Sequence, residues 1–240
     1  MKNYPIIILP GWMLGSKRFE LLAKEFEKAG HKTFIVDFPG FEQDIKLSKI
    51  FNLTDYVKYL RGFLKTHNIT KAIFVCHSFG GRVALKFLSQ EPKFAHALIL
   101  SGTPGFLTVS KVKLRLFLYI AKVGGIVFSL PLIKRIKDHV RKLYYKVIGA
   151  KDFYHSQGLM RETFKRIIAE QLVEYMKKIR VPTLLLWGEK DKLVPVAVAK
   201  KMQKVLYKST IVIVKDHGHM FICRNPQMFV SQTNSFLRDL

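Results

Sequence analysis

The sequence predicts an α/β fold built around a mainly parallel sheet. Short apolar runs rich in β-branched residues alternate with longer segments of helical periodicity along the chain. Each apolar run is unbroken, which is typical of parallel strands that are covered on both faces. A length of 240 residues with 49% hydrophobic content suits one α/β domain with a sizeable core, with or without an inserted segment.

The apolar runs place the strands. We predict strands at Ile6–Leu9, Thr33–Asp37, Ala72–His77, Ala97–Ser101, Thr183–Trp187 and Ile211–Val214. Between them the spacing predicts helices at Lys17–Ala29, Thr54–Thr66, Gly81–Gln90, Val196–Leu206 and Gln227–Leu237. In the first helix, Phe19, Leu22 and Phe26 recur at helical spacing. Alternation of this kind implies right-handed crossovers between parallel strands.

One stretch interrupts the alternation. From Pro104 to Tyr175 no convincing strand occurs, and a basic amphipathic helical pattern is broken by Gly124-Gly125, Pro131 and Gly149. A run of about seventy residues is too long for a crossover or a loop. We therefore predict an α/β core formed by residues 1–103 and 176–240, with residues 104–175 as a helical cap or lid over one end of the sheet.

The net charge of +24 favours anionic partners in general. However, the basic residues are scattered, with no run of five or six and no nucleic-acid-binding signature. The pattern therefore argues against nucleic acid and indicates solvated helix faces or a compositional bias. A second interpretation is that the basic surface of residues 104–175 steers an acidic carrier protein or an anionic surface to the protein.

Cysteine usage and the apolar segments indicate a cytoplasmic protein. Cys76 and Cys223 form no CxxC motif and have no metal-ligand spacing, which fits a reducing compartment without excluding one disulfide. The N-terminal apolar stretch is too short for a signal sequence. The longest other stretch, Leu116 to Ile133, is interrupted by Lys122, Gly124-Gly125 and Pro131, so we expect no transmembrane segment.

A candidate nucleophile follows the third predicted strand. The sequence Cys76-His77-Ser78-Phe79-Gly80-Gly81 resembles the G-x-S-x-G elbow, in which a sharp strand-to-helix turn exposes the central serine. Cys76 replaces the first glycine of that pattern. Taken alone, Ser78 could equally be an ordinary serine at a helix N-terminus.

Two further side chains follow strand ends in the order expected of a catalytic triad. Asp191 comes after the strand Thr183–Trp187, and His219 comes after Ile211–Val214, giving the chain order Ser, Asp, His. Because carboxyl ends of parallel strands share one edge of the sheet, these side chains can converge there.

Other residues near these strand ends are alternatives. His217 is a second candidate for the base, and His77 is expected to point elsewhere because its position in the elbow is variable. Asp216 is too close in sequence to His219 to orient it easily, and Asp37 belongs to a strand-end turn.

Together these residues resemble the α/β-hydrolase family, in particular its lidded serine esterases, over nearly the whole chain. The further matching segments are Pro10-Gly11-Trp12, Asp37-Phe38-Pro39-Gly40-Phe41, Gly188-x-x-Asp191-x-x-x-Pro195 and Gly218-His219 followed by Pro226, Phe229 and Phe236. Pro10 stands where the family usually has histidine, and Arg224 where it often has an acid. The family's N-terminal hairpin is missing, so we expect a reduced sheet of about six strands.

The resemblance implies a serine hydrolase that needs no metal or organic cofactor. It assigns Ser78 as nucleophile, His219 as base and Asp191 as its orienting acid, with the backbone N–H groups of Trp12 and Phe79 as the oxyanion hole. We expect small-molecule carboxylic esters with small to medium acyl chains. A thioesterase, lactonase, C–C bond hydrolase, acyltransferase or carrier-protein ester hydrolase would use the same residues, and a non-catalytic binding protein is a further alternative.

Overall fold

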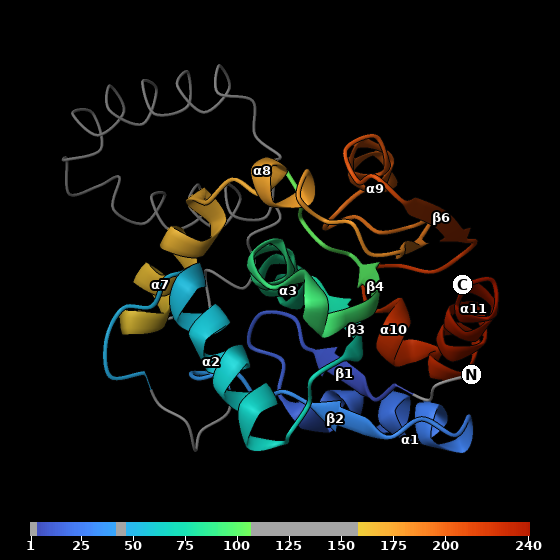
Figure 1. Cartoon of the computed structure of the whole chain (residues 1–240). Coiled ribbons are helices and arrows are strands. Elements are labelled where there is room, and N and C mark those ends of the chain that lie inside the picture. Colours follow the sequence, from blue (N-terminus) through green and yellow to red (C-terminus); the bar gives the residue numbers. More distant parts are fainter. Residues whose placement is uncertain (1–3, 42–46, 107–157) are drawn as a thin grey trace, which may run out of the picture.

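A computed structural model describes residues 4–41, 47–106 and 158–240. Six strands form one parallel sheet in the order β2-β1-β3-β4-β5-β6 (Figure 1), which confirms the predicted fold class. The strands are β1 (Ile6–Leu9), β2 (Thr33–Ile35), β3 (Ala72–His77), β4 (Ala95–Ser101), β5 (Thr183–Gly188) and β6 (Ser209–Val214).

The two edge strands differ from the prediction. β2 ends at Ile35, two residues before the predicted end at Asp37, and its residues are only partly buried. β6 begins at Ser209 and leaves Ile213 39% exposed. An edge strand has a neighbour on one side only, and the helices cover the centre of the sheet better than its margins. The expectation that every strand is covered on both faces was therefore wrong for β2 and β6.

The sheet separates two hydrophobic cores because successive side chains of a strand point to opposite faces. In β3, Phe74 and Cys76 enter one core, whereas Ile73 and Val75 enter the other. The first core lies beneath α2 (Leu53–Thr66), α3 (Phe79–Gln90), α8 (Val173–Met176) and α9 (Val196–Gln203). The second lies beneath α1 (Glu20–Lys28), α10 (Phe221–Arg224) and α11 (Pro226–Arg238). Figure 1 shows these two layers on either side of the sheet.

Short 3-10 helices precede α1 and β4, at Ser16–Phe19 and Pro92–Phe94. Within the described ranges, no helix is both long enough and apolar enough to cross a membrane.

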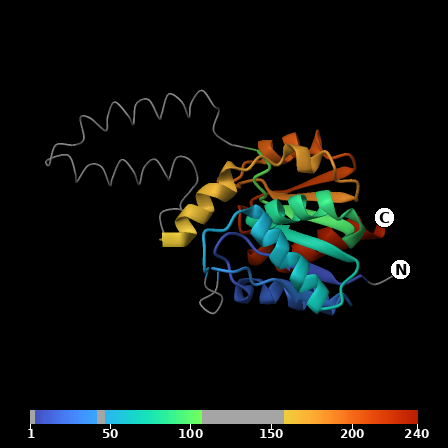
Figure 2. The same ribbon diagram turned by 60° about the vertical axis from the view of Figure 1, so that its left-hand side comes forward.

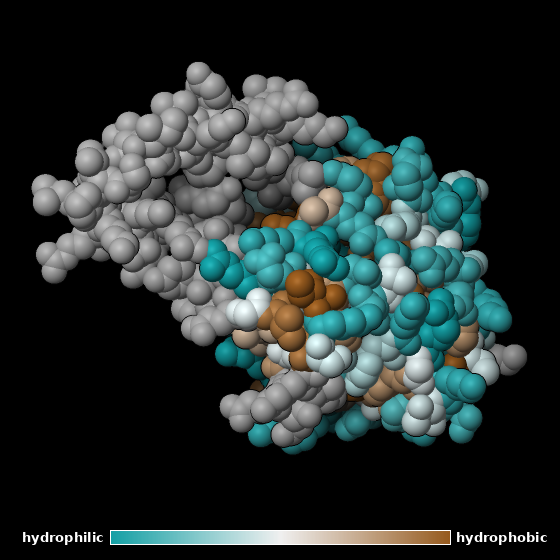
Figure 3. Space-filling view, turned by 90° about the vertical axis from the view of Figure 1, so that its left-hand side faces the viewer, coloured by the Kyte–Doolittle hydropathy of each residue, from teal (hydrophilic) through white to brown (hydrophobic). Residues whose placement is uncertain are grey.

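Helix α7 (Gly158–Ala169) lies across the carboxyl side of the sheet (Figure 2). Its Phe164 ring lies 5.0 Å from the ring of Trp12, which follows β1. Its Thr163 hydroxyl accepts a hydrogen bond from the Phe51 N–H at 2.9 Å. In the space-filling view from the side of α7, the described surface is mainly hydrophilic around a compact hydrophobic patch (Figure 3). The other residues of the predicted cap, 107–157, lie outside the described residues.

The strand order fixes where a ligand can bind. From β1 the chain continues to β2 on one side of β1, and then crosses to β3 on the other side. The strands β1 and β3 are therefore neighbours, and the segments that follow them lead in opposite directions. In open parallel sheets, such a switch point forms a crevice outside the carboxyl ends of the strands. The loop that begins at Pro10 and the turn at Ser78 follow these two strands.

Candidate functional site

Ser78 occupies a strained turn between β3 and α3. Its backbone has φ 48° and ψ −109°, which is unfavourable for any residue with a side chain. Its N–H donates to the Ser101 carbonyl at the end of β4, at 2.9 Å. Such a turn is the geometry of a nucleophile elbow, which raises the serine above the end of the sheet.

Small residues allow the elbow to pack tightly. A Cβ added at Gly80 would collide with the Leu9 carbonyl of β1, and one at Gly81 would collide with the Thr103 side chain. Cys76, in place of the pattern's first glycine, is fully buried between β1 and β4. Burial raises the pKa of the Cys76 thiol well above its ordinary value, so the thiol does not compete with Ser78 as a nucleophile.

Asp191 and His219 form a hydrogen-bonded pair. His219 Nδ1 lies 2.8 Å from Asp191 Oδ2, and the Asp191 side chain is almost entirely buried. Asp191 Oδ1 accepts the backbone N–H groups of Leu193 and Val194 at 2.9 and 2.8 Å. Because a carboxylate only accepts hydrogen bonds, His219 Nδ1 carries the proton and Nε2 keeps a lone pair for accepting a proton.

Gly102 connects the elbow to this pair, and the sequence analysis missed it. It has φ +57° and follows Ser101, whose carbonyl accepts the Ser78 N–H. A Cβ at position 102 would lie 2.7 Å from His219 Cε1 and 3.4 Å from Asp191 Oδ2. The only signal in the sequence is a glycine directly after a predicted strand, a place where the other candidate residues also occur.

His77 also lies within the site, contrary to the expectation that it points elsewhere. Its ring is fully buried with its centre 4.7 Å from that of His219, and a Cβ at Gly11 would lie 2.9 Å from its Cδ2. Within the described ranges, neither ring nitrogen has a hydrogen-bond partner. Burial, and secondarily the proximity of His219, lower the pKa of His77 well below its usual value, although the nearby Ser101 backbone acts in the opposite direction. His77 is therefore a neutral imidazole beside the candidate base.

The alternative acids and base are engaged elsewhere. His217 Nδ1 lies 2.7 Å from the Lys215 carbonyl. Asp216 is exposed and pairs with Lys190 at 2.5 Å, which lowers the pKa of that carboxyl group. Asp37 accepts the Ser16 N–H at 2.9 Å. Among these candidates, the structure pairs only Asp191 with a histidine, and that histidine is His219.

Two backbone N–H groups are free at the switch point. Leu14 N–H donates to the Gly11 carbonyl at 3.1 Å, which closes a turn with Trp12 and Met13 at its centre. Phe79 is the first residue of α3, so its N–H has no acceptor within the helix. Among the described residues, neither the Trp12 nor the Phe79 amide is hydrogen-bonded.

The structure does not connect all the candidate catalytic residues by hydrogen bonds. Across the described ranges no hydrogen bond links Ser78 Oγ to His219. Contacts of this kind are often long in unliganded hydrolytic enzymes and shorten when substrate binds. In the same ranges, no group of three or more His, Cys, Asp or Glu side chains is arranged to hold a metal ion.

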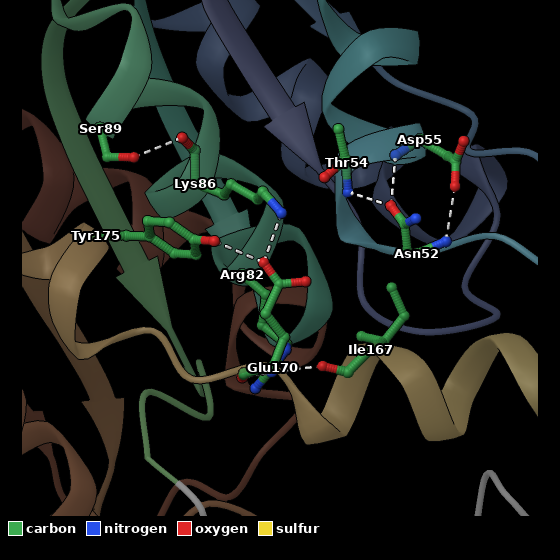
Figure 4. Close-up of polar contacts among 9 residues, drawn as sticks. All are labelled: Asn52, Thr54, Asp55, Arg82, Lys86, Ser89, Ile167, Glu170 and Tyr175. Atoms are coloured by element: carbon green, nitrogen blue, oxygen red, sulfur yellow. Dashed lines mark hydrogen bonds and ion pairs between the residues drawn. The ribbon is translucent and has the colours of Figure 1, made fainter.

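A polar network fixes α7 and the following turn to α3, the helix that begins after Ser78 (Figure 4). The buried Arg82 guanidinium donates to the carbonyls of Pro104, Ile167 and Glu170 at 3.0, 2.6 and 2.7 Å. Burial lowers the pKa of Arg82 to about 10, which leaves it cationic at neutral pH. Glu170 Oε1 in turn binds Lys86 Nζ at 2.5 Å and the Tyr175 hydroxyl at 2.7 Å.

Comparison with known proteins identifies the family of the chain. Residues 3–223 match the Hydrolase_4 family, described as serine aminopeptidase, S33, which covers most of the chain. The chain belongs to this family of α/β hydrolases. The resemblance to the α/β-hydrolase family is thereby confirmed, and the protein is a hydrolase of the α/β type.

Individual relatives of this α/β hydrolase are distant. The chain is 25% identical to the 2-hydroxy-6-oxo-6-(2'-aminophenyl)hexa-2,4-dienoic acid hydrolase of Metapseudomonas resinovorans, covering 98% of this chain and 84% of that protein. It is 21% identical to Lipase 1 of Psychrobacter immobilis, covering 90% and 71%. An esterase structure from Exiguobacterium antarcticum superposes with a TM-score of 0.75 at 18% identity, covering 98% and 92%, and supports the fold alone.

Proposed function

We propose that this α/β hydrolase is a serine esterase that cleaves carboxylic esters with small to medium acyl chains through an acyl-enzyme. The Asp191–His219 hydrogen bond carries the proposal, because it lies against Gly102 at the same sheet edge as the strained Ser78 turn. A buried acid that orients a histidine beside an elbow serine is the arrangement that activates a hydroxyl group for acyl transfer.

In the proposed reaction, His219 Nε2 removes the proton from Ser78 Oγ as that oxygen attacks the ester carbonyl carbon. Asp191 holds the imidazole in its Nδ1–H tautomer and stabilises the imidazolium that forms. The Trp12 and Phe79 N–H groups bind the developing oxyanion, a contribution of about 3 kcal/mol for each donor in related enzymes. His219 then returns the proton to the departing alcohol, and water releases the acyl group by the same steps.

Other substrates would use the same residues. A thioester, a lactone or an acyl group on an acidic carrier protein is cleaved by the same attack, and the dienoic acid hydrolase relative adds a carbon–carbon bond to these options. Esters remain our proposal because two lipases occur among the curated relatives. The acyl-chain range rests on the apolar residues of the predicted cap, such as Phe106, Leu116 and Phe128, as a candidate lining for the acyl group. A non-catalytic binding protein is the remaining alternative.

Covalent trapping tests the proposal. We expect a fluorophosphonate to add one mass equivalent to the wild-type protein and none to Ser78→Ala, as measured by intact mass spectrometry. His219→Gln should slow labelling by at least about a hundredfold, since an unactivated serine is a poor nucleophile.

The matched control is His217→Gln, two residues away and bound to a backbone carbonyl, which should label at the wild-type rate. Folded wild-type protein that remains unlabelled would favour the binding-protein alternative. Equal loss in both histidine variants would remove His219 from its proposed role.

A further inference from the structure

The indole N–H of Trp12 is a buried donor without an acceptor in the part of the chain that the structure describes. Trp12 is 5% exposed, and its Nε1 has no hydrogen-bond partner among those residues. The chain's other tryptophan, Trp187, donates its Nε1–H to the Val194 carbonyl at 2.8 Å. A buried tryptophan N–H usually finds a partner, because desolvating it without one is unfavourable. The exception at Trp12 therefore requires an explanation.

Three phenylalanine rings surround the Trp12 indole. Their centres lie 5.1 Å (Phe41), 5.4 Å (Phe79) and 5.0 Å (Phe164) from that of Trp12. They come from the turn after β2, the first residue of α3 and α7. None of these side chains offers an oxygen or nitrogen acceptor. An apolar enclosure with a single polar donor is typical of a small-molecule site, where the donor fixes the orientation of the ligand.

This enclosure adjoins the proposed chemistry. Phe79 directly follows Ser78, and the backbone N–H groups of Phe79 and Trp12 are the proposed oxyanion donors. Trp12 thus presents a backbone donor and a side-chain donor from one residue. A ligand with two acceptors a few bonds apart would satisfy both donors at once.

We propose that the Trp12 indole N–H binds a second oxygen acceptor in the acyl group, so that the preferred substrates are esters of oxo-acids and not of plain alkanoic acids. This inference rests on the proposed esterase function. The reason is that a site with a buried hydrogen-bond donor discriminates strongly against a substrate analogue that lacks the acceptor and leaves the donor unpaired.

A paired set of esters tests the inference by kinetics. In p-nitrophenyl 4-methylpentanoate a methyl group replaces the keto oxygen of p-nitrophenyl 4-oxopentanoate, so the two acyl groups have nearly the same shape. We expect the ratio of kcat/KM for the oxo ester to that for the methyl ester to fall about tenfold in Trp12→Phe, which keeps an aromatic ring but lacks the N–H. Differences in the intrinsic reactivity of the two esters cancel in this comparison between proteins.

A ratio that is unchanged in Trp12→Phe would overturn the inference while leaving the esterase proposal intact. Hydrolysis that is equally fast in Ser78→Ala and the wild type would instead contradict the esterase proposal. If Trp12→Phe does not fold, a binding measurement on Ser78→Ala decides the inference without turnover.

The binding measurement uses indole-¹⁵N-labelled tryptophan, which gives one N–H resonance for Trp12 and one for Trp187. Ethyl 4-oxopentanoate should move the Trp12 proton downfield as the hydrogen bond forms, and ethyl 4-methylpentanoate should not. The Trp187 resonance is the internal control, since its N–H is already bonded. If neither ester moves the Trp12 resonance, the N–H faces an aromatic ring in a weak N–H···π contact and the inference is wrong.

Discussion

Gly102 supports His219 through contact and not through chemistry. An alanine there would place its Cβ 2.7 Å from His219 Cε1, and the imidazole would have to move away from Asp191. We predict that Gly102→Ala lowers kcat/KM for ester hydrolysis by about a hundredfold, because a displacement of about 1 Å is enough to produce such a loss. Steady-state kinetics on folded protein measures it.

Gly30→Ala is the matched control for Gly102→Ala. Gly30 also has positive φ (+88°), but a Cβ there would meet nothing within 4 Å. Both variants bear the backbone cost of about 1–2 kcal/mol for a left-handed alanine, so both should lose stability and only Gly102→Ala should lose activity. Full activity in Gly102→Ala would show that His219 tolerates the contact.

His77 should make the stability of the protein depend on pH. Its pKa lies well below the usual value in the folded state, so below about pH 6.5 the unfolded chain binds a proton that the native state does not. This lowers the free energy of unfolding as the pH falls below 6.5 and has no effect above it. We predict that His77→Phe reduces the loss of stability between pH 7.5 and pH 5.5 by about 1 kcal/mol.

Denaturant unfolding at both pH values measures the His77 effect. Parallel curves for wild type and His77→Phe would mean that the native state also protonates His77.

Among individual residues, Ser78, Asp191 and His219 could be predicted as one group from the sequence, because each follows a strand in the expected order. The sequence could not reveal the roles of Gly102 and His77. Their importance comes from contacts between residues distant in the chain, such as Gly102 with His219, and such contacts depend on how neighbouring strands align. The unpaired indole of Trp12 was invisible for the same reason.

Among the elements, α7 depends on one arginine. Arg82 binds the carbonyls of Ile167 and Glu170 at the carboxyl end of α7, groups that a helix leaves without internal partners. We predict that Arg82→Met lowers the free energy of unfolding by about 2–4 kcal/mol, since it leaves three carbonyls without their donor. Guanidinium unfolding monitored by circular dichroism measures the loss.

Arg61→Met is the control for Arg82→Met. Arg61 pairs with Glu91 through a more exposed side chain, so its replacement should cost no more than about 1 kcal/mol. Equal losses in the two variants would show that burial of the Arg82 bonds contributes nothing extra.

Most elements were predictable because their signals are local. Apolar runs placed all six strands within two residues of their observed ends. The Asn52 side chain accepts the N–H groups of Thr54 and Asp55, which explains the clear start of α2. By contrast, the bounds of α7 and α8 could not be predicted, because they depend on partners such as Arg82 and Phe51 that lie far away in the sequence.

For the molecule as a whole, the charge of +24 gives a prediction about partners. If an acidic carrier protein presents the acyl group, kcat/KM for the carrier-bound substrate should fall at least about tenfold between 50 and 500 mM NaCl, because salt screens long-range attraction. A neutral p-nitrophenyl ester should change less than about twofold. Equal salt dependence for both substrates would contradict carrier recognition and favour compositional bias as the origin of the charge.

The Arg82 contacts also bear on how this hydrolase can diversify. One guanidinium holds Pro104 before residues 107–157 and holds Ile167 and Glu170 after them. Both junctions of this stretch of chain are thus fixed to the same side chain of α3. Segments of different length and composition can therefore be exchanged between these junctions, in evolution or in the laboratory, while α3 keeps its place after Ser78.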